Sequence, residues 1–295
     1  MVRLGTAITY DDPKGQAMTR PRLGEIGVWS PDLTPELAAL LEELGYGALW
    51  VGGSPDGDLR IVEALLSATT TVTVATGIVN IWKDDAKTVA ASFHRIEAAY
   101  PGRFLLGIGA GHREATGERY VRPYEALQRY LDDLDEAKVP RDSRVLAALG
   151  PKVLRLAADR TAGAHPYLTN PAHTGRARDL LGPGPLLAPE QKVVLADDQR
   201  SGRRIARRTL RHYLRLSNYT NNFRRLGFGD DDFKDDGSDR LVDAMVAHGD
   251  PAALKVRITE HLAAGADHVA VQLLSAAGAD PRDGFRALAG VLFTE

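Results

Sequence analysis

Short apolar runs alternate along the chain with longer amphipathic stretches. The runs are rich in β-branched and aromatic residues, which favour strands, and each is followed by a stretch with helical spacing of its apolar positions. Alternating strands and helices of this kind predict an α/β fold with a parallel sheet, and their number predicts a closed (β/α)8 TIM barrel. The predicted strands are 26–29, 48–51, 72–82, 103–112, 145–149, 162–168, 192–196 and 268–274.

Helix signals separate these strands. Thr34-Pro35-Glu36 supplies a hydroxyl cap, a proline in the first turn and an acidic residue, and Gly45 ends the predicted helix. The interval between the seventh and eighth strands is the exception, because it is much longer than the others. We expect an insertion of two or three extra helices there, at about 197–267, with an acidic loop at 229–239. As a hypothesis, this insertion forms a lid or pocket wall on a single domain that spans 1–295.

The fourth strand is the most distinctive, because it combines a buried run with glycine at every second position. Phe104-Leu-Leu106 leads into Gly107, Gly109 and Gly111, and the stretch ends on His112. Glycines at a strand end let a ligand approach the backbone closely. The spacing G-x-G-x-G does not open directly into a helix, so it does not match the dinucleotide fingerprint G-x-G-x-x-G. Tight packing without a ligand remains the alternative explanation.

The carboxyl ends of the other strands are candidates for the same site, because ligands of α/β barrels bind at that edge. Gly150-Pro151-Lys152 opens a helix whose free N–H groups suit a phosphate, although Lys152 could equally be a solvated lysine. His112 and His165 both follow strands and are candidates to line the site. The strand-end clusters are Trp29-Ser30, Gly52-Gly53-Ser54, Gly77-Ile78-Val79-Asn80, Gly109-Ala110-Gly111-His112, Gly150-Pro151-Lys152 and His165-Pro166-Tyr167.

Composition narrows the function further. The apolar content of 44% suits a globular protein with a large core, and the absence of cysteine excludes disulfides, thiolate metal sites and thiol nucleophiles. The net charge of −2 gives no general attraction to nucleic acid, and no apolar run is long enough for a membrane span. The histidines have no metal-binding spacing, and no G-x-S-x-G motif is present. We therefore expect a soluble cytoplasmic protein with a small-molecule substrate.

One basic segment lies within the predicted insertion. Either its arginines form a solvated face offset by the acidic residues 230–236, or they form a platform for a polyanionic tail. Binding of nucleic acid is a third reading, but few aromatic residues are interleaved. The arginines are Arg203, Arg204, Arg207, Arg208, Arg211 and Arg215.

With these motifs in hand, the chain resembles the luciferase-like monooxygenase superfamily. Within it, the chain is most similar to oxidoreductases that use coenzyme F420, a 5-deazaflavin. The resemblance covers about 23–292. It is strongest in Ala75-Thr-Gly-Ile-Val-Asn-Ile-Trp82, Leu106-Gly-Ile-Gly-Ala-Gly-His112, Val145-Leu-Ala-Ala-Leu-Gly-Pro-Lys152, Ala164-His-Pro-Tyr167 and Pro189-Glu-Gln-Lys-Val-Val-Leu195.

The resemblance implies a cofactor site and a reaction. It implies a non-proline cis peptide at or near Gly77–Ile78, which bulges the backbone against the cofactor ring, and hydride transfer between the deazaflavin C5 and an organic substrate. It also implies that Trp29 and Trp82 contact the substrate. The residues expected to bind the cofactor are Gly77, Ile78, Asn80, Gly109, Ala110, Gly111, His112, Leu149, Gly150, Pro151, Lys152 and His165.

One departure from the related dehydrogenases affects the catalytic residue. Those enzymes carry an acidic residue and a histidine after strand two, where this chain has Gly53 and Ser54. His112 is therefore our candidate for the proton donor. The alternatives are a monooxygenase of the same fold that uses flavin mononucleotide (FMN), and a cofactor-binding protein without catalysis. Relatives are commonly homodimers, so a homodimer is expected.

Overall fold

The computed structural model describes residues 20–117, 120–276 and 278–294. The strands are β1 (Ile26–Ser30), β2 (Ala48–Val51), β3 (Thr73–Thr76), β4 (Val79–Asn80), β5 (Phe104–Gly109), β6 (Arg144–Leu146), β7 (Gly163–Ala164), β8 (Leu186–Leu187), β9 (Glu190–Leu195), β10 (Val246–Gly249) and β11 (Val269–Leu273). The helices are α1 (Pro35–Glu43), α2 (Arg60–Ser67), α3 (Ala86–Ala99), α4 (Arg113–Thr116), α5 (Pro123–Glu136), α6 (Pro151–Arg160), α7 (Pro171–Leu181), α8 (Gln199–Tyr213), α9 (Ser217–Arg225), α10 (Asp239–Met245), α11 (Pro251–Ala263) and α12 (Pro281–Leu292), with the 3₁₀ turns η2 (Arg141–Ser143) and η3 (Asp230–Phe233).

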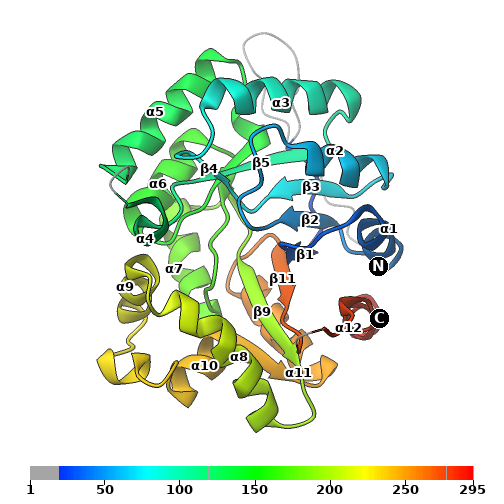
Figure 1. Cartoon of the computed structure of the whole chain (residues 1–295), viewed down its shortest axis with the longest axis vertical. Coiled ribbons are helices and arrows are strands. Elements are labelled where there is room, and N and C mark those ends of the chain that lie inside the picture. The colour runs from blue at the N-terminus through cyan, green and yellow to red at the C-terminus, as the bar shows by residue number, and fades with distance from the viewer. Residues whose placement is uncertain (1–19, 118–119, 277, 295) are drawn as a thin grey trace.

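All strands lie in one parallel sheet that curls upon itself (Figure 1). The order is β10-β9-β11-β1-β2-β3-β5-β6-β7-β8, and β4 also pairs with β5. Consecutive strands β8 and β9 link the two halves of this curl. On one side Ala188 N–H donates to Ala164 O at 2.9 Å, and on the other Ala270 N–H donates to Pro189 O at 2.9 Å. The α/β class and a curled, barrel-like parallel sheet are thus confirmed.

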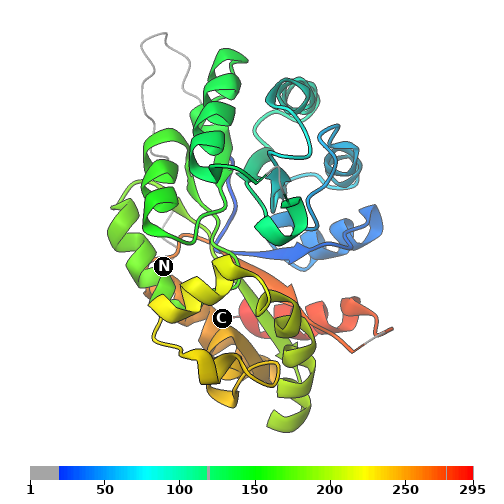
Figure 2. The same ribbon diagram turned by 60° about the vertical axis from the view of Figure 1, so that its left-hand side comes forward.

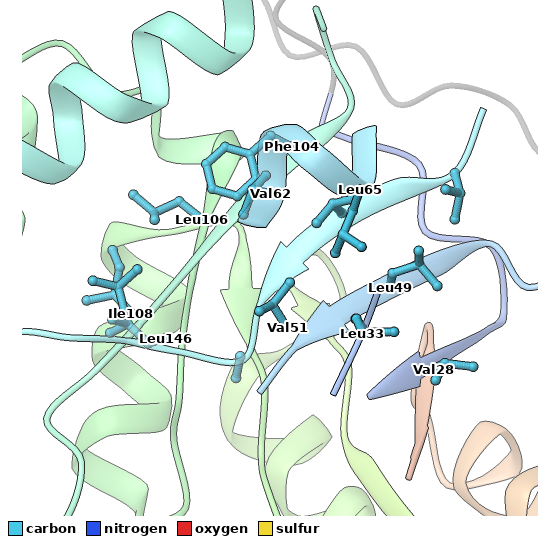
Figure 3. Close-up of a cluster of buried hydrophobic side chains, with 14 of the residues drawn as sticks. Val28, Leu33, Leu49, Val51, Val62, Leu65, Phe104, Leu106, Ile108 and Leu146 are labelled. Carbon is cyan, nitrogen blue, oxygen red and sulfur yellow. The ribbon is translucent and has the colours of Figure 1, made fainter. Parts of the chain in front are cut away.

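Side chains alternate between the two faces of the strands, as period-2 geometry requires. Val28, Leu49 and Val51 point outward and pack with helix residues such as Leu65 in the largest hydrophobic cluster (Figure 3). Trp29, Trp50, Leu105 and Val145 belong to a separate cluster, which fills the interior of the curl. Figure 2 shows the helices standing around the outside of the sheet. The outer helices therefore bury one face of each strand, while the inner face is left for packing and chemistry.

Local signals explain where several helices begin. Thr34 Oγ1 accepts the N–H of Leu37 at 3.2 Å, which confirms the predicted cap of α1.

Helices α1 and α12 lie side by side although they come from opposite ends of the chain (Figure 1). Among the helices that the structure describes, none is both long and apolar enough to cross a membrane.

The segment at 197–267 differs from its prediction. It holds α8, α9, η3, α10 and α11, but it also holds strand β10, which pairs in parallel with β9 through Ala247 and Val193. A purely helical insertion was therefore the wrong description. Strand β10 is only four residues long and follows α10 without a break, so the apolar pattern gave no separate signal for it.

The third predicted strand, 72–82, is divided. Strands β3 and β4 both pair with β5, and Gly77 and Ile78 lie between them. The cis peptide expected at Gly77–Ile78 is absent: the peptide bonds of the described residues are all trans. A non-proline cis bond costs about 3–4 kcal/mol, and the backbone leaves β3 at Gly77 without that cost. There the N–H of Gly77 donates to Val51 O at 2.8 Å.

Candidate functional site

The candidate site lies at the carboxyl ends of the strands, which a parallel sheet brings to one edge. There Trp29 of β1 lies directly over two predicted strand-end glycines. A Cβ atom on Gly52 would be 2.4 Å from Trp29 Cη2, and one on Gly77 would be 2.4 Å from Trp29 Nε1. Any side chain at either glycine would displace the indole ring. The glycines thus make a flat surface on which an aromatic ring lies against the backbone.

The ends of β4 and β5 form the neighbouring part of the site. Asn80 pairs with Gly109 in the sheet, and Val79 pairs with Ile108. A Cβ on Gly109 would lie 2.7 Å from Ile78 Cδ1, and one on Gly111, whose φ is +60°, would lie 2.7 Å from Asn80 Nδ2. The structure therefore brings together the predicted residues of these two strand ends, with Ala110 between the two glycines.

His112 follows β5 and precedes the short helix α4. Its ring is half-buried and lies 5.4 Å from the ring of Tyr219 in α9, centroid to centroid. Burial lowers the pKa of His112, while neighbouring Asn218 and Glu114 oppose that shift, so the neutral imidazole is favoured. Its Nδ1 is buried without a hydrogen-bond partner among the described residues. A buried nitrogen in this state suits a polar ligand or a proton transfer.

Helix α9 covers this end of β5 and adds a second unpartnered polar group. Glu114 accepts the N–H of Ser217 at 2.9 Å, which holds the start of α9 beside His112. Asn222, one turn further on, is only 1% exposed, and its Nδ2 has no partner within the described part of the chain. The sequence analysis did not single out Asn218, Tyr219 or Asn222.

The start of α6 has the character of an anion site. Gly150 caps the helix without a side-chain hydrogen bond, Pro151 occupies the first turn, and Lys152 is exposed. A Cβ on Gly150 would lie 3.9 Å from Nη1 of Arg225, which comes from α9. The turn itself is fixed by His173, whose Nε2 donates to Leu149 O at 3.0 Å. A helix N-terminus with two nearby cations attracts negative charge.

Two predicted residues lie elsewhere. His165 is fully buried in the barrel interior, where it stacks on Trp50 with ring centroids 4.0 Å apart. Burial lowers its pKa to about 3, and its Nδ1 donates to Ala188 O at 2.7 Å. Trp82 lies beyond β4, with its ring centroid 5.8 Å from that of Tyr120. The backbone N–H of Trp82 donates to Asn80 Oδ1 at 3.0 Å, which ties this residue to the end of β4.

A buried polar cluster connects β9 and β11, and the sequence did not predict it. Lys192 and Glu190 of β9 are both fully buried and form an ion pair of 3.1 Å. Lys192 Nζ also donates to Gln272 Oε1 at 2.7 Å and lies 3.7 Å from the centre of the Tyr167 ring. Burial lowers the pKa of Lys192 to about 8 and raises that of Glu190, and each partner's charge opposes the shift. The predicted strand began at Lys192 and left out Glu190, so the two charged residues on one face of β9 were not recognised as a pair.

A cleft of about 560 Å³ opens beside Trp29, between the ends of β1 and β11 and helices α8 and α12. Trp29 and Ser30, one of the predicted strand-end clusters, both line it. Further lining residues are Leu37, Ile205, Arg208, Gln272 and Phe285. The mouth therefore has two parts, the strand-end glycines on one side and this cleft on the other, and Trp29 belongs to both.

The basic segment is now resolved into two faces of α8. Arg203 pairs with Asp239 and Asp243, and Arg207 pairs with Asp239. Arg211 pairs with Asp236 in the same way. The acidic offset predicted at 230–236 is thus found for Arg211 alone of these three, whereas Arg203 and Arg207 pair with aspartates of α10. Arg208, on the other face, lines the cleft.

Comparison with known proteins agrees with this architecture. Residues 15–137 match the family model described as luciferase-like monooxygenase. Over this part of the chain, the match confirms the resemblance seen in the motifs. No curated protein sequence matches the chain.

Solved structures with the same fold include enzymes of two cofactor types. An F420-dependent secondary alcohol dehydrogenase in complex with an F420-acetone adduct superimposes with a TM-score of 0.70 and 15% identity, covering 91% of this chain and 98% of that one. The coenzyme F420 dependent tetrahydromethanopterin reductase from Methanopyrus kandleri superimposes with a TM-score of 0.67 and 16% identity. The match covers 92% of this chain and 98% of that one.

An FMN enzyme is similar to the same extent. It is the oxygenating constituent of 3,6-diketocamphane monooxygenase from Pseudomonas putida, a type II Baeyer-Villiger monooxygenase in complex with FMN. The superposition has a TM-score of 0.66 and 15% identity, and it covers 90% of this chain and 96% of that one. Both deazaflavin and flavin cofactors thus occur among solved structures that share this fold.

Proposed function

We propose that the protein is an F420-dependent oxidoreductase that transfers a hydride between the deazaflavin C5 and an organic substrate. The observation that carries this proposal is the set of strand ends at β4, β5 and β6. They combine glycines on which neighbouring side chains pack closely, buried polar atoms without partners among the described residues, and the cationic start of α6. The choice of F420 rests on the branch of the family that the motifs resemble.

The residues present fit such a cofactor. Gly77, Gly109 and Gly111 let the side chains of Trp29, Ile78 and Asn80 pack closely against the strand ends, so these side chains would support a flat ring. The start of α6 with Lys152 and Arg225 would hold a phosphate. When bound, the deazaflavin supplies the hydride chemistry, and the protein supplies binding, orientation and electrostatics.

His112 is the residue that we assign to proton transfer. Hydride transfer to or from a carbon that bears oxygen requires a matching proton at that oxygen. A half-buried imidazole with a lowered pKa is neutral at pH 7, so in the oxidative direction it can accept the proton of the substrate hydroxyl and pass it to solvent. In the reductive direction it would take a proton from solvent and give it to the substrate oxygen. Its unpartnered Nδ1 is the atom available for this step.

The FMN-dependent monooxygenase remains the second candidate, since a neighbour of the same fold is described in complex with FMN. Oxygen consumption separates the two, because the reduced deazaflavin does not readily activate oxygen. We expect reduced F420 to be oxidised by a suitable ketone without oxygen uptake. Oxygen uptake with reduced FMN and none of this F420 activity would favour the monooxygenase.

The anion site gives a test that does not depend on knowing the substrate. Arg225→Met removes the guanidinium beside Gly150, and a charge-assisted hydrogen bond to a phosphate is worth about 1.5 kcal/mol, or about tenfold in Kd. Arg224→Met is the matched control, because Arg224 pairs with Asp230 on the exposed side of the same helix. Equal F420 affinity of the two variants would contradict the assigned phosphate position. We also propose a homodimer, which size-exclusion chromatography with light scattering tests.

A further inference from the structure

The cleft beside Trp29 is lined by the side-chain amide of Gln272, and the buried cluster around Lys192 determines which end of this amide faces the cleft. Gln272 of β11 lines the cleft and also reaches the interior. An ammonium group can only donate hydrogen bonds, so the carboxamide end that faces Lys192 at 2.7 Å is the oxygen, Oε1.

Two tyrosines support the same orientation. Tyr167 OH donates to Gln272 Oε1 at 2.9 Å, and its own oxygen lies 2.7 Å from Tyr213 OH. Because each hydroxyl has one proton, Tyr213 must donate to Tyr167. The chain of donors ends on Gln272 Oε1, which therefore accepts from two groups. The NH2 end of the carboxamide is left for the cleft.

The walls of the cleft complement this donor. The Trp29 indole offers a flat apolar surface, and Leu37, Ile205 and Phe285 add apolar side chains. Charged side chains are also part of the lining: Asp32, Arg208, Asp280 and Arg282. Behind Trp29 lies Gly77, where the indole contacts the backbone of a predicted cofactor-binding strand end. Trp29 is thus both a wall of the cleft and a direct neighbour of that strand end.

We propose that this cleft is the substrate site and that it selects an apolar carbonyl compound, whose oxygen accepts a hydrogen bond from Gln272 Nε2. Trp29 holds the apolar body of this compound. Lys192 and Tyr167 are positioning residues, since they fix the carboxamide and do not touch the ligand. The inference rests on the proposed oxidoreductase function for its role, but the binding that it predicts can be measured without a cofactor.

The test compares two probes of the same shape by isothermal titration calorimetry. Acetophenone carries a carbonyl oxygen, and α-methylstyrene carries a CH2 group in its place. We expect acetophenone to bind the full chain with a Kd of about 1 mM and at least about fivefold more tightly than α-methylstyrene. Equal affinities, or no binding of either probe at several millimolar, would overturn the proposal.

Gln272→Glu tests the direction of the carboxamide. A carboxylate still accepts the hydrogen bonds of Lys192 and Tyr167, so the interior is kept, but it presents an acceptor to the cleft instead of a donor. We expect the preference for acetophenone to disappear while the urea midpoint changes little. Gln128→Glu on α5 adds the same charge away from the cleft and should retain the preference. An unchanged preference in Gln272→Glu would refute the role of Nε2.

The two proposals can fail separately. Selective acetophenone binding together with no binding of F420 or FMN would leave the cleft intact and remove the cofactor assignment. Binding of F420 with equal affinity for both probes would keep the cofactor and reject the cleft as a carbonyl site.

Discussion

Replacing Lys192 with methionine is the sharpest test of the buried cluster. The substitution keeps the length of the side chain but removes the ammonium group that pairs with Glu190. Glu190 is fully buried, and its other oxygen accepts only the N–H of Leu168, at 2.9 Å, among the hydrogen bonds of the described residues. The variant therefore contains a buried carboxyl without its cation.

The magnitude follows from the charge state of Glu190. Removing one partner of a buried ion pair costs about 3–5 kcal/mol when the other stays charged. If Glu190 is protonated, that penalty disappears, and the loss of the hydrogen bonds from Lys192 to Glu190 and Gln272 costs about 1 kcal/mol each. We therefore expect a loss of about 2 kcal/mol at pH 5 and about 4 kcal/mol at pH 8.

The sign of the pH dependence is determined by the raised pKa of Glu190, which burial causes. The folded variant binds a proton that the unfolded chain releases near pH 4.3, as model peptides do. Its stability is thus greatest below the unfolded pKa and is lost as the pH rises toward the folded pKa.

The loss in the free energy of unfolding of Lys192→Met relative to the wild type is measured by urea denaturation, followed by circular dichroism at pH 5 and pH 8. Lys87→Met, on the exposed surface of α3, is the control and should change the free energy of unfolding by less than about 0.5 kcal/mol. The double variant Lys192→Met/Glu190→Gln should recover part of the loss at pH 8. A loss below about 1 kcal/mol, or equal losses at both pH values, would refute the reasoning.

Three further predictions follow from particular contacts. Backbone N–H groups of Thr70, Thr71 and Val72 outweigh the effect of burial and lower the pKa of Glu42 to about 2. Glu42→Gln should therefore cost about 1–2 kcal/mol at pH 7 and progressively less as the pH falls toward the folded pKa, where the wild-type carboxyl becomes protonated, with Glu43→Gln as the urea-denaturation control. Gly77→Ala should displace Trp29 and shift its fluorescence, and an unshifted spectrum would mean that Trp29 does not lie on Gly77. As a control, Gly175→Ala has no atom within 4 Å of its new Cβ and should stabilise helix α7 by about 0.5–1 kcal/mol. His112→Ala should lower turnover at least about 100-fold in steady-state assays, while His94→Ala should not, and full turnover in His112→Ala would exclude the proton-transfer role.

The strand pattern could be predicted because strands buried on both faces give uninterrupted apolar runs. Each of the eight predicted strands overlaps an observed one, from Ile26 to Leu273. Strand β10 was missed because half of its residues, His248 and Gly249, are not apolar. The division of the third predicted strand at Gly77 was missed because it depends on contacts of Gly77 with Trp29 and Val51, which come from other strands.

The candidate site was predictable only in part. Glycines at strand ends mark the mouth, since the backbone edge of a parallel sheet is where ligands bind. The cluster of Lys192 with Gln272 was not predictable, because these residues are far apart in sequence and meet only when β9 pairs with β11. His165 follows a strand as predicted, yet its stacking on Trp50 directs it into the interior.

The central claim is that the strand ends bind a deazaflavin, and a titration tests it most directly. The purified protein is titrated separately with F420 and with FMN, and the fluorescence of Trp29, Trp50 and Trp82 is followed. We predict saturable quenching by F420 at micromolar concentration and much weaker quenching by FMN. Tighter binding of FMN, or no binding of either cofactor, would contradict the account.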